Sequence, residues 1–105
     1  MSEIRQIAEL LARIGDKRHH EFLRVPAMSA GIYVLPPGAT DGQTPHKEDE
    51  IYYVVRGRAK MRLGREELAV SEGDVIFIEK AAEHRFFEIA EELVLLVIFA
   101  PAESS

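Results

Sequence analysis

The segment PHKEDEIYYVV places one histidine and three acidic residues directly around the start of a run of β-branched and aromatic residues. In an extended chain the side chains alternate between two faces, so Thr44, His46, Glu48, Glu50 and Tyr52 share one side. If Glu50 faces the interior, its carboxylate needs a partner or a cation, because an unpaired buried charge is costly. A divalent metal ion bound by a neutral imidazole and a carboxylate would meet that need.

A second candidate histidine begins another predicted strand, in the segment EHRFFEI. His84 and Phe86 alternate onto one face of this strand, while Arg85 and Phe87 take the other. A histidine that starts a strand in each half of the chain could meet the other at a point between two sheets. Taken alone, each histidine is more often a solvated or hydrogen-bonded side chain than a metal ligand.

One amphipathic helix and several short strands must position these residues. Apolar residues recur at three- and four-residue steps from Glu3 to Ile14, with Ser2 as a candidate N-cap and Gly15 as the end of the helix. The β-rich runs that follow are separated by turn signals, which predicts an all-β sandwich or barrel rather than alternating βαβ units. The final PAESS is expected to fray.

Two of the predicted strands, IYYVV and LVLLVIF, are apolar at consecutive positions. Strands of this kind have both faces covered. The N-terminal helix can cover part of the outer face, and a second subunit could cover the rest. We therefore expect a homodimer that packs through sheet surface and helix.

The composition fits one domain over residues 1–105, with a helix and connector at 1–20 and a β-barrel core at 30–100. We expect neither a secretory signal nor a membrane span, because charges interrupt the N-terminal segment and the apolar runs are short. The absence of cysteine excludes thiolate metal sites and suits the reducing cytoplasm. A net charge of -5 argues against nucleic acid and favours a small-molecule partner.

The stretch from Gly38 to Gly57 resembles the first motif of the cupin superfamily, G-x5-H-x-H-x3-E-x6-G. Every spacing is kept, with Thr44, His46 and Glu50 at the three ligand positions. A small single-domain cupin with an RmlC-like jelly-roll β-barrel, or double-stranded β-helix, is what this resemblance implies.

The stretch at 73–88 resembles the second cupin motif, G-x5-P-x-G-x2-H-x3-N. The spacing again holds and His84 matches, but Glu79, Ala81 and Glu88 stand in place of proline, glycine and asparagine. The first two replacements change the stiffness of the turn more than its chemistry, because proline presets one dihedral angle and glycine permits positive φ. The two motifs with their strands cover about residues 30 to 100.

The resemblance implies that His46, Glu50 and His84 bind one divalent metal ion, with iron or manganese favoured and zinc or nickel as alternatives. Thr44 replaces the first motif histidine, and a hydroxyl is a poor ligand for a transition metal. Either Gln43 or Thr44 could supply a fourth ligand. Two imidazoles and one carboxylate form the set that non-haem iron oxygenases use, with open positions for oxygen and substrate.

Aromatic residues two positions after the ligands are expected to line the cavity around the metal. These are Tyr52 and Phe86, and Glu88 could point into the same cavity. Tyr33 is expected to face that cavity or the dimer partner. Two polar pairs are expected to be solvated instead: Glu48 with Asp49, and His19 with His20.

Two classes of function remain open at this stage. The first is a mononuclear metalloenzyme that activates oxygen, as dioxygenases do, or polarises a carbonyl or enol of a small organic molecule. The second is a cupin that binds a small molecule without catalysis, which the missing first histidine favours. A third reading is a metal that only stabilises the mouth of the barrel. No hydrolase triad or glycine-rich phosphate loop is recognisable in the sequence.

Overall fold

A computed structural model describes residues 2–42 and 45–104 of the chain. Within them, one helix precedes six strands: α1 (Ile7–Ile14), β1 (His19–Val25), β2 (Met28–Leu35), β3 (Asp49–Leu63), β4 (Glu66–Ser71), β5 (Val75–Ile78) and β6 (His84–Ala100). None of the described residues forms a helix with the length and apolar character needed to cross a bilayer.

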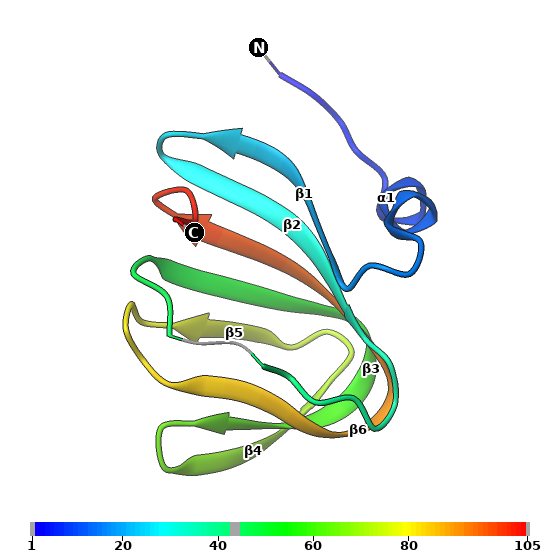
Figure 1. Cartoon of the computed structure of the whole chain (residues 1–105), viewed down its shortest axis with the longest axis vertical. Helices are drawn as coiled ribbons and strands as arrows, with labels where there is room; N and C mark the ends of the chain where they lie inside the picture. Colours follow the sequence, from blue (N-terminus) through cyan, green and yellow to red (C-terminus); the bar gives the residue numbers. More distant parts are fainter. Residues whose placement is uncertain (1, 43–44, 105) are drawn as a thin grey trace.

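All strand pairs are antiparallel, in the order β1-β2-β6-β3-β4, and β5 pairs with β3 beside this path. The long strands β3 and β6 bend strongly, so that the sheet curls over itself and encloses an interior (Figure 1). The predicted all-β jelly-roll architecture with an N-terminal helix is confirmed. In the part of the chain that is described, no pairing joins β1 to β4, so the curled sheet is not a closed barrel.

Two apolar clusters hold this sheet together. The inner cluster fills the interior of the curled sheet with side chains from β2, β3, β4, β5 and β6, including Tyr52, Phe86 and Leu95. The outer cluster joins Leu10 and Ile14 of α1 to the outer face of β2 and β6. The consecutive apolar residues of LVLLVIF are thus explained, because the helix covers the face that the interior does not.

The apolar run in β3 is covered less completely. Ile51 and Tyr53 are each 40% exposed on its outer face. Their cross-strand partners in β5, Phe77 and Val75, are 61% and 68% exposed. This apolar patch, which we define as Ile51, Tyr53, Val75 and Phe77, is where a second subunit would have to pack.

The helix is shorter than its sequence pattern predicted. It begins at Ile7 rather than Glu3, and its N-cap is Gln6, which makes no side-chain capping bond, rather than Ser2. The physical reason is that Ile4 has nothing to pack against and is 93% exposed. Helices of this length depend on tertiary packing of their apolar face, so the helix starts only where that packing starts. Gly15 ends it, as predicted, with a φ of 58°.

One motif glycine is required by a close approach of two strands. Gly57 lies in β3 where the pairing with β6 shifts register, and its φ is 103°. A Cβ at this position would lie 2.2 Å from the carbonyl oxygen of Glu92 in β6. Any larger residue would therefore push apart the two longest strands of the sheet.

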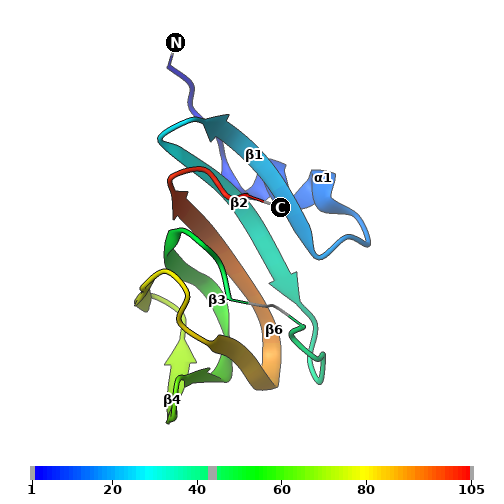
Figure 2. The same ribbon diagram turned by 60° about the vertical axis from the view of Figure 1, so that its left-hand side comes forward.

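The segments before and after the main strands differ from the sequence prediction. The first strand begins at His19, inside the segment predicted to be a connector. Residues 101–104, which we call the C-terminal segment, do not fray but fold back beside β2 (Figure 2). The amide of Ala102 approaches the carbonyl of Pro26 at 3.4 Å, and that of Glu103 donates to Ser29 Oγ at 2.9 Å. These contacts place the segment next to the polar interior of the curl.

Candidate metal centre

Three polar side chains from distant parts of the chain converge inside the curled sheet. His46 lies just before β3, Glu50 is the second residue of β3, and His84 is the first residue of β6. One potential ligand atom from each lies within 4.8 Å of those of the other two. The structure thus brings together the trio that the motif spacing singled out. Their role as metal ligands remains a prediction.

The pair at the bottom of this cluster is shielded from water. The side chains of His84 and Glu50 are each 1% exposed, and Nε2 of His84 lies 3.2 Å from Oε1 of Glu50. The other ring nitrogen, Nδ1, donates to the carbonyl oxygen of Ala82 at 3.0 Å. In the neutral ring Nε2 therefore presents a lone pair to a carboxylate oxygen, an arrangement that calls for a proton or a metal cation between them.

Burial and the neighbouring polar groups act in opposite directions on the pKa of His84. Burial lowers the pKa, but the Glu50 carboxylate and the Ala82 carbonyl outweigh that effect, so the net pKa lies above the ordinary value for histidine. The cluster therefore attracts positive charge.

The carboxylate of Glu50 gives the most direct sign that this cluster suits a cation. Both oxygens are buried, and neither has a hydrogen-bond donor among the described residues. Buried carboxylates are normally paired or bound to a metal, because the desolvation of the charge is otherwise not repaid. The residues therefore fit a divalent metal ion.

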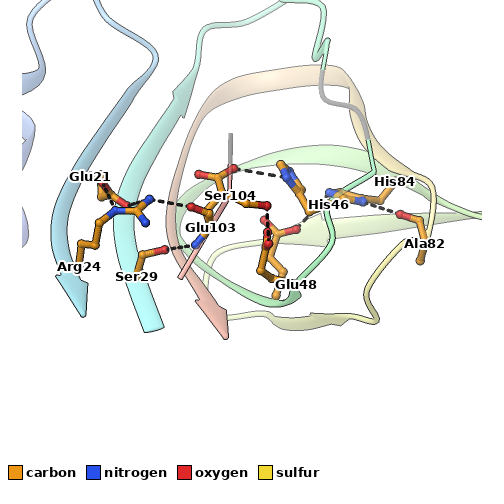
Figure 3. A network of polar contacts seen from close by, with 10 residues as sticks. Glu21, Arg24, Ser29, His46, Glu48, Ala82, His84, Glu103 and Ser104 are labelled. Carbon is orange, nitrogen blue, oxygen red and sulfur yellow. Dashed lines mark hydrogen bonds and ion pairs between the residues drawn. The ribbon is translucent and has the colours of Figure 1, made fainter. Parts of the chain in front are cut away.

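The first histidine of the trio is held in the same manner as the second. Nδ1 of His46 lies 3.3 Å from Oε2 of Glu103, in the C-terminal segment (Figure 3). Each histidine thus has an oxygen at Nδ1, and Nε2 is the ring nitrogen that would bind a cation. Metal-binding histidines usually have such an oxygen partner at the second ring nitrogen. Burial raises the pKa of Glu103, and the neighbouring histidines His46 and His19 offset part of that rise.

A cavity of about 190 Å³ opens onto this cluster. Its lining combines His46 and Glu50 with apolar side chains of β6 and with polar residues of β1, β2 and the C-terminal segment. The full lining is His19, Tyr33, His46, Glu50, Val97, Phe99 and Glu103. A ligand in this cavity would therefore touch both the candidate metal centre and several polar groups.

Tyr33 fulfils the expectation that it faces this cavity. Its hydroxyl donates to Oδ1 of Asp41 at 2.8 Å. Burial and the nearby Asp41 carboxylate raise the pKa of Tyr33 far above the ordinary value for tyrosine. The tyrosine therefore stays protonated and presents its oxygen as an acceptor.

Three side chains expected to line the cavity lie elsewhere. Tyr52 and Phe86 are fully buried in the inner cluster, with ring centroids 5.1 Å apart, and Tyr52 packs 6.1 Å from the ring of His84. Tyr52 thus packs against His84, and Phe86 packs against Tyr52. Glu88 is exposed and pairs with Nζ of Lys60 at 2.9 Å, because a φ of 45° at this residue turns the strand. Gln43 and Thr44, the proposed fourth ligands, lie outside the described residues.

Several polar residues near the site were not expected there. Glu48, predicted to be solvated, is only 5% exposed, and one of its oxygens accepts from Ser104 Oγ at 2.7 Å. Glu48 alternates with His46 and Glu50 in the sequence, and this pattern could have predicted that it faces the interior with them. Asp41 is 3% exposed and accepts from the amide of Phe86 at 2.9 Å. Nothing in its local sequence distinguishes it from a loop residue.

His19 reaches the cavity because the strand beside it lacks a side chain. A Cβ on Gly31 of β2 would lie 2.8 Å from Nε2 of His19. The ring of His19 stands edge-on to that of Tyr33, with centroids 6.3 Å apart. The glycine at position 31 was thus the one sequence feature that could have indicated this close packing of β1 against β2.

The turn before β6 is hydrogen-bonded to the backbone of His46. Ala81 occupies the position of the motif glycine and has a φ of 66°, a conformation that favours glycine. Its amide donates to the carbonyl oxygen of His46 at 2.7 Å. The departure from the motif is therefore accommodated at some cost in backbone strain, and the link between the two motifs is kept.

A curled antiparallel jelly roll with two histidines and a glutamate gathered in its interior defines a double-stranded β-helix domain. The Cupin domain family matches residues 31–99, which is more than half of the chain, and the chain belongs to this family. The resemblance seen in the two motifs is thereby confirmed.

The chain is also similar to known proteins in sequence and in fold. An uncharacterized protein of Streptomyces coelicolor is 44% identical over 89 residues, which cover 85% of each chain. A crystal structure of the protein TT1209 from Thermus thermophilus superposes with a TM-score of 0.77 at 27% identity and covers 96% of this chain and 99% of its own. A Klebsiella pneumoniae protein with a double-stranded β-helix domain has a TM-score of 0.81 at 17% identity, covering 96% and 91%.

Proposed function

We propose that the protein is a mononuclear metal-dependent cupin enzyme that acts on a small organic molecule. The observation that carries this proposal is the Glu50 carboxylate, which is buried without a hydrogen-bond donor among the described residues and has a nitrogen of each of two imidazoles within 4.8 Å. Both imidazoles have Nδ1 against an oxygen, so that their Nε2 atoms suit a shared cation. Iron or manganese is favoured by this ligand set, with zinc or nickel as alternatives.

A bound metal would supply a Lewis acid for a carbonyl or enol oxygen or, as iron, a centre for dioxygenase-like oxygen chemistry. His46, Glu50 and His84 would hold it and leave two or three coordination positions open toward the cavity. The apolar side chains of Val97 and Phe99 would keep that side of the cavity dry.

The size of the cavity supports a small substrate. Its volume of about 190 Å³ is below the range of about 300–1,000 Å³ that is typical of pockets for drug-sized ligands. The polar groups of His19, Tyr33 and Glu103 in the lining would orient such a molecule toward the metal.

Elemental analysis of protein purified without a chelator or histidine tag tests the proposal. We expect about one transition-metal ion per chain, and thermal stabilisation of the stripped protein by added Fe, Mn, Ni or Zn. Both effects should vanish in His84→Asn and persist in His20→Asn, since His20 lies in β1 but not at the cavity. Metal-free protein that no added metal stabilises would refute the proposal.

A cupin that binds a small molecule without catalysis is the second candidate, and the threonine at position 44 in place of a ligand histidine favours it. In that case Glu50→Gln should leave ligand binding and thermal stability unchanged. If the metal only stabilises the fold, its removal should lower stability, yet azide or nitric oxide should not alter its spectrum. A homodimer and a cytoplasmic location remain predictions from the sequence.

A further inference from the structure

We propose that Glu103 is a positioning residue that holds His46 in the tautomer and orientation needed to bind the metal. The inference rests on the proposed metal site and extends it to the C-terminal segment, which lies outside both cupin motifs. Oε2 of Glu103 lies 3.3 Å from Nδ1 of His46, and the two side chains are only 26% and 17% exposed. Water therefore competes weakly for this contact.

The backbone of the C-terminal segment is fixed on two sides, which leaves the Glu103 side chain directed at the site. On one side, the amide of Glu103 donates to Ser29 Oγ at 2.9 Å, and Nη2 of Arg24 donates to the Glu103 carbonyl at 2.7 Å. On the other side, Ser104 Oγ donates to Oε2 of Glu48 at 2.7 Å. Figure 3 shows these contacts, which lead from β1 and β2 through Glu103 to His46.

His46 needs such a support more than His84 does. His84 belongs to a strand, is 1% exposed, and has its Nδ1 proton directed to a backbone carbonyl. His46 lies before the start of β3, outside any helix or strand. An acceptor at Nδ1 keeps the ring proton on that atom and leaves the lone pair on Nε2 for the metal. Glu103 supplies to His46 what the Ala82 carbonyl supplies to His84.

Two variants of the full chain separate this role from a general structural one. Glu103→Gln keeps an acceptor of the same size, whereas Glu103→Leu removes the acceptor at similar volume. The matched control is Glu92→Leu, which removes a surface carboxylate that pairs with Arg56. The measurements are the Co²⁺ dissociation constant with its visible spectrum, and the His46 tautomer in the metal-free protein by long-range ¹H–¹⁵N correlation, assigned with His46→Asn.

We expect the metal-free wild type to carry the His46 proton on Nδ1. In Glu103→Leu the proton should move to Nε2 and the Co²⁺ affinity should fall by about 10- to 100-fold, with an altered cobalt spectrum. Glu103→Gln should keep the tautomer and most of the affinity, and the control should match the wild type.

Two results would overturn the inference. One is a His46 proton on Nε2 in the wild type, and the other is unchanged cobalt affinity and tautomer in Glu103→Leu. Failure of the wild type to bind Co²⁺ would instead refute the proposed function, while the tautomer measurement would still decide the role of Glu103.

Discussion

Replacing Glu50 by glutamine should change the stability of the protein in opposite directions without and with metal. The carboxylate of Glu50 is 1% exposed and lies 3.2 Å from Nε2 of His84. A glutamine amide at this position is neutral and can donate a hydrogen bond to that nitrogen, because the Nδ1 proton of His84 already points to Ala82. The variant therefore relieves a buried charge and gains a bond, but loses the anionic metal ligand.

The size of both effects follows from the burial. An unsatisfied buried polar group costs about 1–3 kcal/mol, so the metal-free variant should gain stability of that order. For a domain of this length, 1 kcal/mol corresponds to roughly 4–8 °C in melting temperature. Metal at 100 times its dissociation constant should stabilise the wild type by about 2.7 kcal/mol, and the variant should lose that gain.

Thermal unfolding followed by circular dichroism, before and after addition of Mn²⁺ or Co²⁺ to chelator-treated protein, measures both effects. Glu48→Gln is the matched control, because Glu48 is also buried and has one oxygen without a donor among the described residues, yet it lies outside the metal cluster. This control should keep the metal-induced rise. The reasoning fails if Glu50→Gln keeps that rise too, or if its metal-free melting temperature falls, which would mean that His84 and Glu50 stabilise the fold as an ion pair.

Three further predictions concern the turn before β6, the cavity wall and the outer face. Ala81→Gly should raise the free energy of unfolding by about 0.5–1 kcal/mol in urea titrations, because it relieves the left-handed backbone at a φ of 66°; a loss of stability would contradict this. Because unfolded tyrosine titrates near pH 10 and Tyr33 resists deprotonation, stability should fall above that pH, by at most about 1.4 kcal/mol per pH unit from this group. Tyr33→Phe should show a shallower fall in chelator-treated protein, and equal slopes would refute the assignment. Phe77→Glu should convert the expected dimer to a monomer in sedimentation velocity, since Phe77 is 61% exposed in the apolar patch; a monomeric wild type would remove that expectation.

The sequence was sufficient for those features that depend on local period and motif spacing. Alternation placed His46 and Glu50 on one face, and the two motifs placed His84 opposite them. The continuous apolar run in β6 indicated cover on both faces, which α1 provides. These are properties of a strand and its immediate neighbours, which a single chain segment encodes.

Features that depend on the path of the chain through space could not be predicted in this way. Glu103 contacts His46 only because the C-terminal segment folds back, and His19 reaches the cavity only because Gly31 of the next strand leaves room. The start of α1 depended on which apolar residues find a surface, which the helical period does not reveal. Glu88 left the expected face because a positive φ interrupted the alternation of its strand.

The anchored C-terminal segment determines how this protein can be joined to other molecules. A fluorescent reporter or an electrode linker placed within residues 101–104 would disturb the bonds of this segment to Ser29 and Glu48, and with them the Glu103 side chain that lines the cavity. Residues 2–6 lead away from the sheet in both ribbon views (Figures 1 and 2), so a label placed there would leave the interior untouched.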